Sequence, residues 1–237
     1  MIYQIADLIV EMECSGRTYR QSQLYQYIGS KKETQILIDP QKEKAHYKSI
    51  LYPELHEEDW EYMLTGSLFY YELLEYNGML LHASAVVFEN KAYLFSAPCG
   101  VGKSTHASLW LKQFPNAYIL NDDKPAIRLI NGCFYVYGTP WSGKTGLNVP
   151  GCVPLQGICF LQQSKENWIK KISSKKAVFN LMSQTTRKLS KVKMEKLFKL
   201  IEDLINNIII YEMGCRIDDE AVQLAYQAMK NNNAKSK

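Results

Sequence analysis

The sequence lacks the features that mark zinc-binding, secreted and membrane-spanning proteins. Its 6 cysteines include no C-x-x-C pair and its 4 histidines do not cluster with them, which argues against a zinc site and predicts reduced thiols. No apolar run approaches the ~18 residues that a membrane helix needs. The N-terminal stretch MIYQIADLIVEME carries three acidic residues and has neither the basic start nor the cleavage site of a signal peptide. We therefore expect a cytoplasmic protein with no membrane partner.

A strong excess of charge of one sign is also missing. The chain of 237 residues is 46% hydrophobic and 22% charged, which is typical of a soluble globular protein, and its net charge is only +4. This weak basic bias suits a protein that handles small molecules bearing phosphate. It is too small to predict a nucleic-acid partner, and we expect none.

The patterns that are present divide the chain into two parts. Residues 1–50 hold the short alternating stretches IADLIVEME and TQILID between polar turns, which predict a small antiparallel, β-rich N-terminal unit. Residues 51–237 predict an α/β core around a mixed β-sheet. Its helices are expected at 59–76, 103–114, 175–185, 191–206 and 218–229, with Asn77-Gly78 ending the first and Asp218 capping the last. Its strands are expected at 80–88, 92–96, 117–120, 126–130, 133–137, 153–161 and 208–213. Two hairpins are predicted, one across Glu89-Asn90-Lys91 and one across Asn131-Gly132.

Two glycine-rich stretches compete for the role of a phosphate-binding loop. GTPWSGKT, residues 138–145, satisfies the pattern G-x-x-x-x-G-K-[ST], whereas APCGVGKST, residues 97–105, has Ala97 in place of the first glycine. Such a loop needs a strand before it and a helix after it, because the backbone N–H groups and the helix N-terminus together attract the anion. Only 97–105 has both, since glycines and prolines follow the second stretch.

We therefore predict that the phosphate loop is 97–105, with Lys103 on the outer phosphates and Ser104 as a magnesium ligand. Ala97 is tolerated there if its φ angle is negative. The alternatives are that this segment is only a turn that opens a helix, and that GTPWSGKT is a turn without an anion. If the second loop faces the first, Ser142 and Lys144 become candidates for binding the acceptor or the transferring phosphoryl group. The nucleotide-binding residues are expected to be Pro98, Cys99, Gly100, Val101, Gly102, Lys103, Ser104 and Thr105.

An acidic pair and a histidine flank this loop in sequence. Asn121-Asp122-Asp123 follows a predicted strand, and adjacent residues at a strand end point in different directions. One carboxylate can therefore bind magnesium while the other takes a proton from an acceptor hydroxyl, and the residues alone leave open which does which. The alternative is an acidic turn. His82, in the strand before the loop, is either an active-site residue or a hydrogen-bonded core residue.

Together these residues resemble the HPr kinase/phosphorylase group, whose nucleotide fold is shared with phosphoenolpyruvate carboxykinase. The resemblance lies in LLHASAVVFENKAYLFSAPCGVGKSTHASLWL followed by YILNDDKPAI and covers residues 78–130. It implies transfer of the γ-phosphoryl group of ATP to a hydroxyl. Lys103 and Ser104 then match the loop lysine and metal ligand, and His82 the active-site histidine. Asp122 takes the role of proton acceptor, and Asp123 that of its neighbour on the metal side.

The chain departs from full-length HPr kinases at Ala97 and in its shorter N-terminal region, and GTPWSGK stands where the family's later glycine-rich signature falls. It is more similar to related short kinases that act in peptide-modification systems or on serine-type acceptors. The leading hypothesis is an ATP- and Mg²⁺-dependent kinase acting on a hydroxyl of a peptide, protein or small metabolite, with homo-oligomers compatible with the sequence. The alternative is a nucleotide-gated regulatory or assembly protein that phosphorylates no partner. Carboxykinase chemistry on an oxo-acid is disfavoured, because no manganese-binding lysine and histidine set is recognisable.

Overall fold

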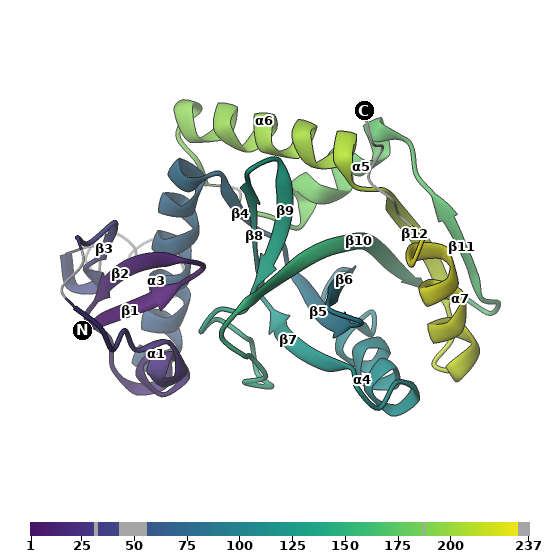
Figure 1. Ribbon diagram of the computed structural model, residues 1–237, viewed down its shortest axis with the longest axis horizontal. Helices are drawn as coiled ribbons and strands as arrows, with labels where there is room; N and C mark the ends of the chain where they lie inside the picture. Colours follow the sequence, from purple (N-terminus) through teal and green to yellow (C-terminus); the bar gives the residue numbers. More distant parts are fainter. Residues whose placement is uncertain (31–32, 43–55, 187, 232–237) are drawn as a thin grey trace.

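A computed structural model describes residues 1–30, 33–42, 56–186 and 188–231 of the protein. A small three-stranded sheet lies at one end of the molecule, and a large curled sheet with helices on both faces forms the rest (Figure 1). The protein is thus a mixed α/β protein with a mixed sheet, as its sequence predicts. Within the described ranges, no helix combines the length and the apolar character that crossing a bilayer requires.

The N-terminal unit is β-rich but not purely antiparallel. β1 (Ile2–Ile5) and β2 (Leu8–Met12) form an antiparallel hairpin, whereas β3 (Ile36–Ile38) pairs with β2 in parallel. The expectation of an antiparallel unit is therefore wrong for the third strand. The helix α1 (Gly16–Ser22) and the 3₁₀ turn η1 (Gln23–Tyr25), which were not predicted, lie on the connection that makes the parallel pairing feasible. Residues 43–50 of the predicted unit lie outside the described residues.

The large sheet has the strand order β4-β8-β9-β10-β6-β5-β7, and β12 pairs with both β10 and β11. The long strand β10 is antiparallel to β9 at its start and parallel to β6 and β12 further on, so it joins the antiparallel and parallel parts of the sheet. The bounds are β4 (Gly78–Leu80), β5 (Ala83–Phe88), β6 (Lys91–Ser96), β7 (Tyr118–Asp123), β8 (Ala126–Ile130), β9 (Cys133–Tyr137), β10 (Cys152–Gln163), β11 (Trp168–Lys171) and β12 (Ile210–Cys215).

The two predicted hairpins are present and have two-residue turns. Glu89 and Asn90 have φ angles of 51° and 57°, and Asn131 and Gly132 have φ angles of 49° and 81°. Positive φ at both central residues matches the right-handed twist of the flanking strands. The first turn places Ala83 opposite Ser96, and this register helps to position the candidate site.

Helices cover both faces of the large sheet. α5 (Ser174–Ser183) and α6 (Lys191–Asn207) pack on one face, and α4 (Lys103–Gln113) and α7 (Asp219–Met229) pack on the other (Figure 1). Ser173, Ser190 and Asp218 cap the N-termini of α5, α6 and α7 by accepting backbone N–H bonds, as predicted for Asp218. α3 (Glu57–Leu73) and the 3₁₀ turn η2 (Leu74–Tyr76) end at Asn77, which adopts the left-handed conformation common at helix ends.

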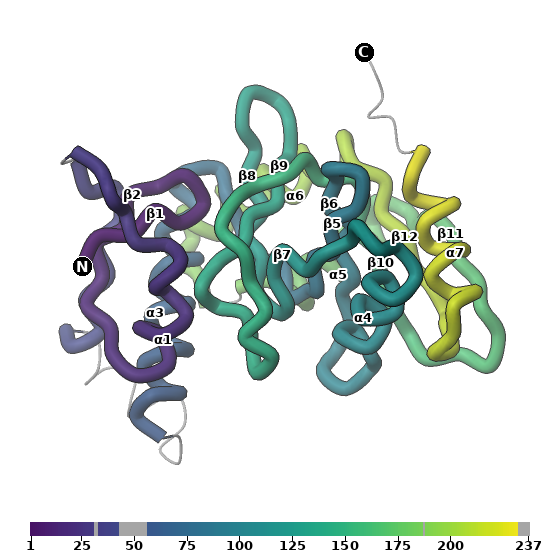
Figure 2. The backbone as a smooth tube through the Cα atoms, turned by 60° about the horizontal axis from the view of Figure 1, so that its bottom comes forward, coloured from purple at the N-terminus to yellow at the C-terminus, as the bar shows by residue number. Residues whose placement is uncertain are grey.

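Besides the apolar clusters on the two faces of the large sheet, another apolar cluster joins the N-terminal unit to the rest of the molecule. It combines buried residues of β1 and β2 with Phe69 and Tyr70 of α3, Tyr137 of β9 and the fully buried Trp141. The segment between β9 and β10, which contains Trp141, runs between the N-terminal unit and β7 (Figure 2). The stretch GTPWSGKT is therefore part of the junction between the N-terminal unit and the large sheet.

Candidate functional site

Three strand ends meet at one edge of the large sheet and bring the predicted site residues together. β5 is antiparallel to both β6 and β7, so the carboxyl ends of β6 and β7 flank the start of β5. In this register Ala83 lies opposite both Ser96 and Asp123, and Ser84 lies opposite Asp122. The predicted phosphate loop, which follows Ser96, therefore begins beside the acidic pair.

The segment 97–102 connects β6 to α4, as a phosphate loop requires. Gly100 and Gly102 have φ angles of 82° and 114°, and a Cβ atom at either would meet nothing within 4 Å. The backbone conformation is therefore what requires glycine at these two positions. Ala97 is buried and does not have a positive φ angle, which explains why the first position of the pattern accepts alanine.

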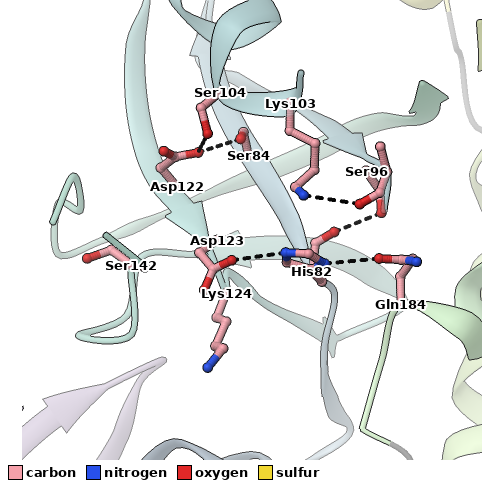
Figure 3. A network of polar contacts seen from close by, with 12 residues as sticks. His82, Ser84, Ser96, Lys103, Ser104, Asp122, Asp123, Lys124, Ser142 and Gln184 are labelled. Carbon is pink, nitrogen blue, oxygen red and sulfur yellow. Dashed lines mark hydrogen bonds and ion pairs between the residues drawn. The ribbon is translucent and has the colours of Figure 1, made fainter. Parts of the chain in front are cut away.

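Lys103 and Ser104 begin α4 and reach in different directions. The Lys103 ammonium donates a hydrogen bond of 3.0 Å to the Ala97 carbonyl, so its side chain folds over the loop. Burial lowers the pKa of Lys103, and the nearby carboxylates of Asp123 and Asp122 offset part of this effect. The Ser104 hydroxyl instead donates to Asp122 Oδ1 at 3.1 Å, and Ser84 donates to the same oxygen (Figure 3).

His82 bridges the acidic pair and a residue that the sequence did not single out. Its Nε2 lies 3.0 Å from Asp123 Oδ1, and its Nδ1 lies 3.0 Å from the Gln184 side-chain oxygen (Figure 3). Its backbone N–H donates to the Gln184 carbonyl, and its own carbonyl accepts from Ser96. His82 lies one residue before β5 rather than within a strand, and its side chain is 32% exposed, which is not the environment of a core histidine.

Asp123 is held in an uncommon backbone conformation and lies near His82 and two lysines. It has a φ angle of 142°, a region that non-glycine residues rarely adopt and that often marks functional sites. Burial raises the pKa of its carboxyl, but the hydrogen bond from His82 and the charges of Lys124 and Lys103 outweigh burial and lower the pKa overall. The carboxylate is thus held ionised beside the glycine-rich segment 97–102.

The second glycine-rich stretch contacts this site through its backbone. No helix follows it, and Gly143 lies so close to Asp123 that an added Cβ would be 2.8 Å from the Asp123 Cβ. Ser142 is buried and hydrogen-bonded to Gln21 and Asn148, whereas Lys144 is exposed. The backbone of this stretch at Gly143 therefore lies beside Asp123. The Ser142 side chain is engaged in the junction with the N-terminal unit.

The oxygen ligands near Ser104 suit a magnesium ion. The described residues contain no group of three or more His, Cys, Asp or Glu side chains arranged to hold a metal. The Ser104 hydroxyl and the Asp122 carboxylate nevertheless converge to 3.1 Å beside the loop. Mg²⁺ prefers such hard oxygen donors, needs few of them from the protein and takes the others from water and phosphate.

Comparisons with known proteins give a distant likeness among solved structures. No protein-family model matches the chain, and no curated protein sequence matches it. Among solved structures, the chain is similar to the HPr(Ser) kinase/phosphatase from Coxiella burnetii with a TM-score of 0.37 and 8% sequence identity, covering 64% of this chain and 94% of that chain. The assignment of the site therefore rests on this chain's own residues.

Proposed function

We propose that the protein is an ATP- and Mg²⁺-dependent kinase that transfers the γ-phosphoryl group to a hydroxyl of a peptide, a protein or a small metabolite. The large sheet would then be a kinase core of the HPr kinase and phosphoenolpyruvate carboxykinase type. The observation that supports this most is the convergence of two pairs, Ser104 with Asp122 and His82 with Asp123, beside a glycine loop that opens a helix.

In this proposal the loop binds the phosphates of ATP. The backbone N–H groups of the first turn of α4 have no helical partners, and together with the helix dipole they favour an anion. The Lys103 ammonium donates a hydrogen bond to the Ala97 carbonyl, and its flexible four-carbon stem lets it donate to a phosphate oxygen instead. Such an exchange replaces a neutral acceptor with a charged one, which strengthens the hydrogen bond.

The geometry favours a division of work between the aspartates that reverses the one implied by the family resemblance. Asp122 accepts from Ser104, so these two residues would hold Mg²⁺, which when bound neutralises charge on the phosphate oxygens. Asp123 faces His82 and is the more accessible carboxylate, with 27% of its side chain exposed, so we assign the proton-accepting role to it. His82 then orients Asp123 and stabilises its charge.

The reaction follows from these positions. The acceptor oxygen forms a bond to the γ-phosphorus while the bond from that phosphorus to the oxygen of the departing ADP breaks. The hydroxyl proton passes to Asp123. The protein contributes mainly by holding these groups in line and by stabilising charge, as in other phosphoryl transfers.

The direct test is incubation of the protein with γ-labelled ATP and Mg²⁺ in the presence of serine-containing peptides, proteins and small alcohols. Label on an acceptor supports the kinase, whereas release of free phosphate alone supports the nucleotide-gated regulatory protein. Lys103→Ala should lower transfer at least ~100-fold. Lys112→Ala, which removes an exposed lysine from the same helix, should leave it unchanged. Equal activity of both variants would exclude the proposed phosphate loop.

A further inference from the structure

A cavity of about 500 Å³ lies beside the first half of the phosphate loop. It is lined by residues 97–101, the end of β10 at 160–163, Asn180, Ser183, Gln184 and Glu212. Building on the proposed function, we propose that this cavity holds the nucleoside half of the nucleotide whose phosphates the loop binds.

The position of the cavity supports a ligand that is continuous with the phosphates. β6, β10 and β12 are parallel neighbours, so their carboxyl ends share one edge of the sheet, and ligands of such sheets bind outside that edge. β5 and β7 lie on the other side of β6 from β10, and β7 carries the acidic pair. A nucleotide with its phosphates at the N-terminus of α4 therefore has the two aspartates on one side and the cavity on the other.

The lining combines apolar surface with uncommitted amides. Phe160 and Leu161 supply apolar surface at the end of β10, while Gln162, Gln163 and Asn180 supply side-chain amides. None of these three amides forms a hydrogen bond to another residue in the described part of the chain. Each amide can both donate and accept, which matches the mixed donors and acceptors on the edge of a nucleobase and on a ribose.

The charges that line this cavity do not suit a phosphate group or an acidic acceptor. No lysine or arginine is among the described residues that line it, and its carboxylate, Glu212, is only 12% exposed and is paired with Lys176 and Lys170. An anion placed there would face the Glu212 carboxylate without a cation of its own. An uncharged nucleoside has no such requirement.

The phosphoryl acceptor does not fit this cavity either, because two side chains lie between the cavity and Asp123, the proposed proton acceptor. Gln184 lines the cavity, and His82 lies between Gln184 and Asp123 (Figure 3). A hydroxyl in the cavity would be separated from the proposed proton acceptor by two side chains. A nucleoside there instead contacts Gln184, the residue that holds His82.

Calorimetric titration of the protein with ATP and with inorganic tripolyphosphate, both with Mg²⁺, tests this assignment. The wild-type protein should bind ATP at least ~10-fold more tightly, because tripolyphosphate cannot use the cavity. Gln163→Ala and Asn180→Ala should each weaken ATP binding up to ~10-fold and leave tripolyphosphate binding unchanged. Asn180→Trp, which fills the cavity, should abolish the preference for ATP. Asn206→Ala is a matched control, since Asn206 is an exposed amide at the end of α6.

The outcomes separate this inference from the proposed function. If ATP and tripolyphosphate bind equally to the wild-type protein, or if the cavity variants weaken both equally, the nucleoside is not in the cavity while the phosphate loop stands. If neither ligand binds, both proposals fail. Circular dichroism checks the fold of each variant, and the two alanine variants decide the result if Asn180→Trp does not fold.

Discussion

At the scale of single residues, the two adjacent aspartates have different proposed roles, which substitutions can test separately. Asp122→Asn should raise the Mg²⁺ concentration for half-maximal transfer ~10-fold or more, because Asp122 is bonded to Ser104 at the proposed metal position. Asp123→Asn should leave that concentration unchanged and lower the rate at saturating Mg²⁺ by ~100-fold or more, because it removes the proton acceptor. Both are measured from transfer rates across a Mg²⁺ titration. The reverse pattern would restore the roles implied by the family resemblance.

The sequence predicted which residues meet at the candidate site better than it predicted which of them contact one another. Lys103, Ser104, His82 and the two aspartates follow from local patterns, because each lies in or beside a strand, loop or helix start with a recognisable order. Which aspartate faces Ser104 depends on the register of β5 against β7, which no local pattern reveals. Gln184 left no signal, because it contacts His82 only through the packing of α5, 102 residues further along the chain.

At the scale of elements, the contact of the glycine-rich stretch 138–145 with Asp123 can be tested separately from the strain of its left-handed glycines. Gly143→Ala should lower the transfer rate at least ~10-fold, because the new Cβ would displace Asp123. Gly146→Ala has nearly the same φ angle, +67° against +66°, but its nearest neighbouring atom is 3.7 Å away on Gln21. Both variants should lose about 1 kcal/mol of stability from the left-handed conformation, and only Gly143→Ala should lose activity. Equal rates in the two variants would remove the loop from the site.

A second prediction at this scale concerns the first turn of α4 and pH. Burial lowers the pKa of His106 from 6.5 to about 4. Its Nε2 accepts from the Trp110 indole, and its buried Nδ1 has no partner among the described residues. As pH falls below 6.5 the unfolded chain binds a proton that the folded protein does not, so this stability is present above pH 6.5 and is lost toward pH 4.

The loss amounts to about 2 kcal/mol between about pH 6.5 and pH 5, at about 1.4 kcal/mol per pH unit. His106→Gln keeps an acceptor for Trp110 but does not titrate, so it should lose less stability over this range than the wild-type protein. Urea unfolding of both proteins at about pH 7 and pH 5 measures the difference, since other titrating groups contribute to both. An identical drop in both proteins would show that His106 titrates normally.

Elements also show where local patterns stop being informative. Turn residues between closely spaced strands predicted the two hairpins, and a capping residue predicted the start of α7, because these signals act within a few residues. Alternation of apolar residues predicted that β2 and β3 are strands, but it carries no information on the direction of pairing, and the two are parallel. β11 is short and borders the sheet only through β12, so its pattern was too weak to predict a strand.

At the scale of the whole molecule, the described residues on either side of the boundary predicted at residue 50 share an apolar core. Trp141 is fully buried, stacks on Phe69 of α3 at 4.9 Å and donates its indole N–H to Thr65. Residues of β1 and β2 belong to the same apolar cluster. The large sheet also bonds directly to the hairpin turn, since Arg128 donates to the Ala6 carbonyl and Tyr137 donates to Asp7. These contacts couple the N-terminal unit to the sheet that carries the site.

Trp141→Ala should therefore destabilise the whole described fold by ~3–5 kcal/mol, through lost burial, a cavity and the loss of the hydrogen bond to Thr65. Trp141→Phe, which keeps most of the ring packing, should cost less. Hydrogen exchange followed by mass spectrometry should show protection falling together in peptides from β1–β2 and from β8–β9, because one cooperative core supports both. If the alanine variant instead exposed β1–β2 while β8–β9 kept its wild-type protection, the N-terminal unit would be an independent domain. Cooperative loss would mean that binding at the phosphate loop also stabilises the N-terminal unit, since ligands stabilise every element that unfolds with their site.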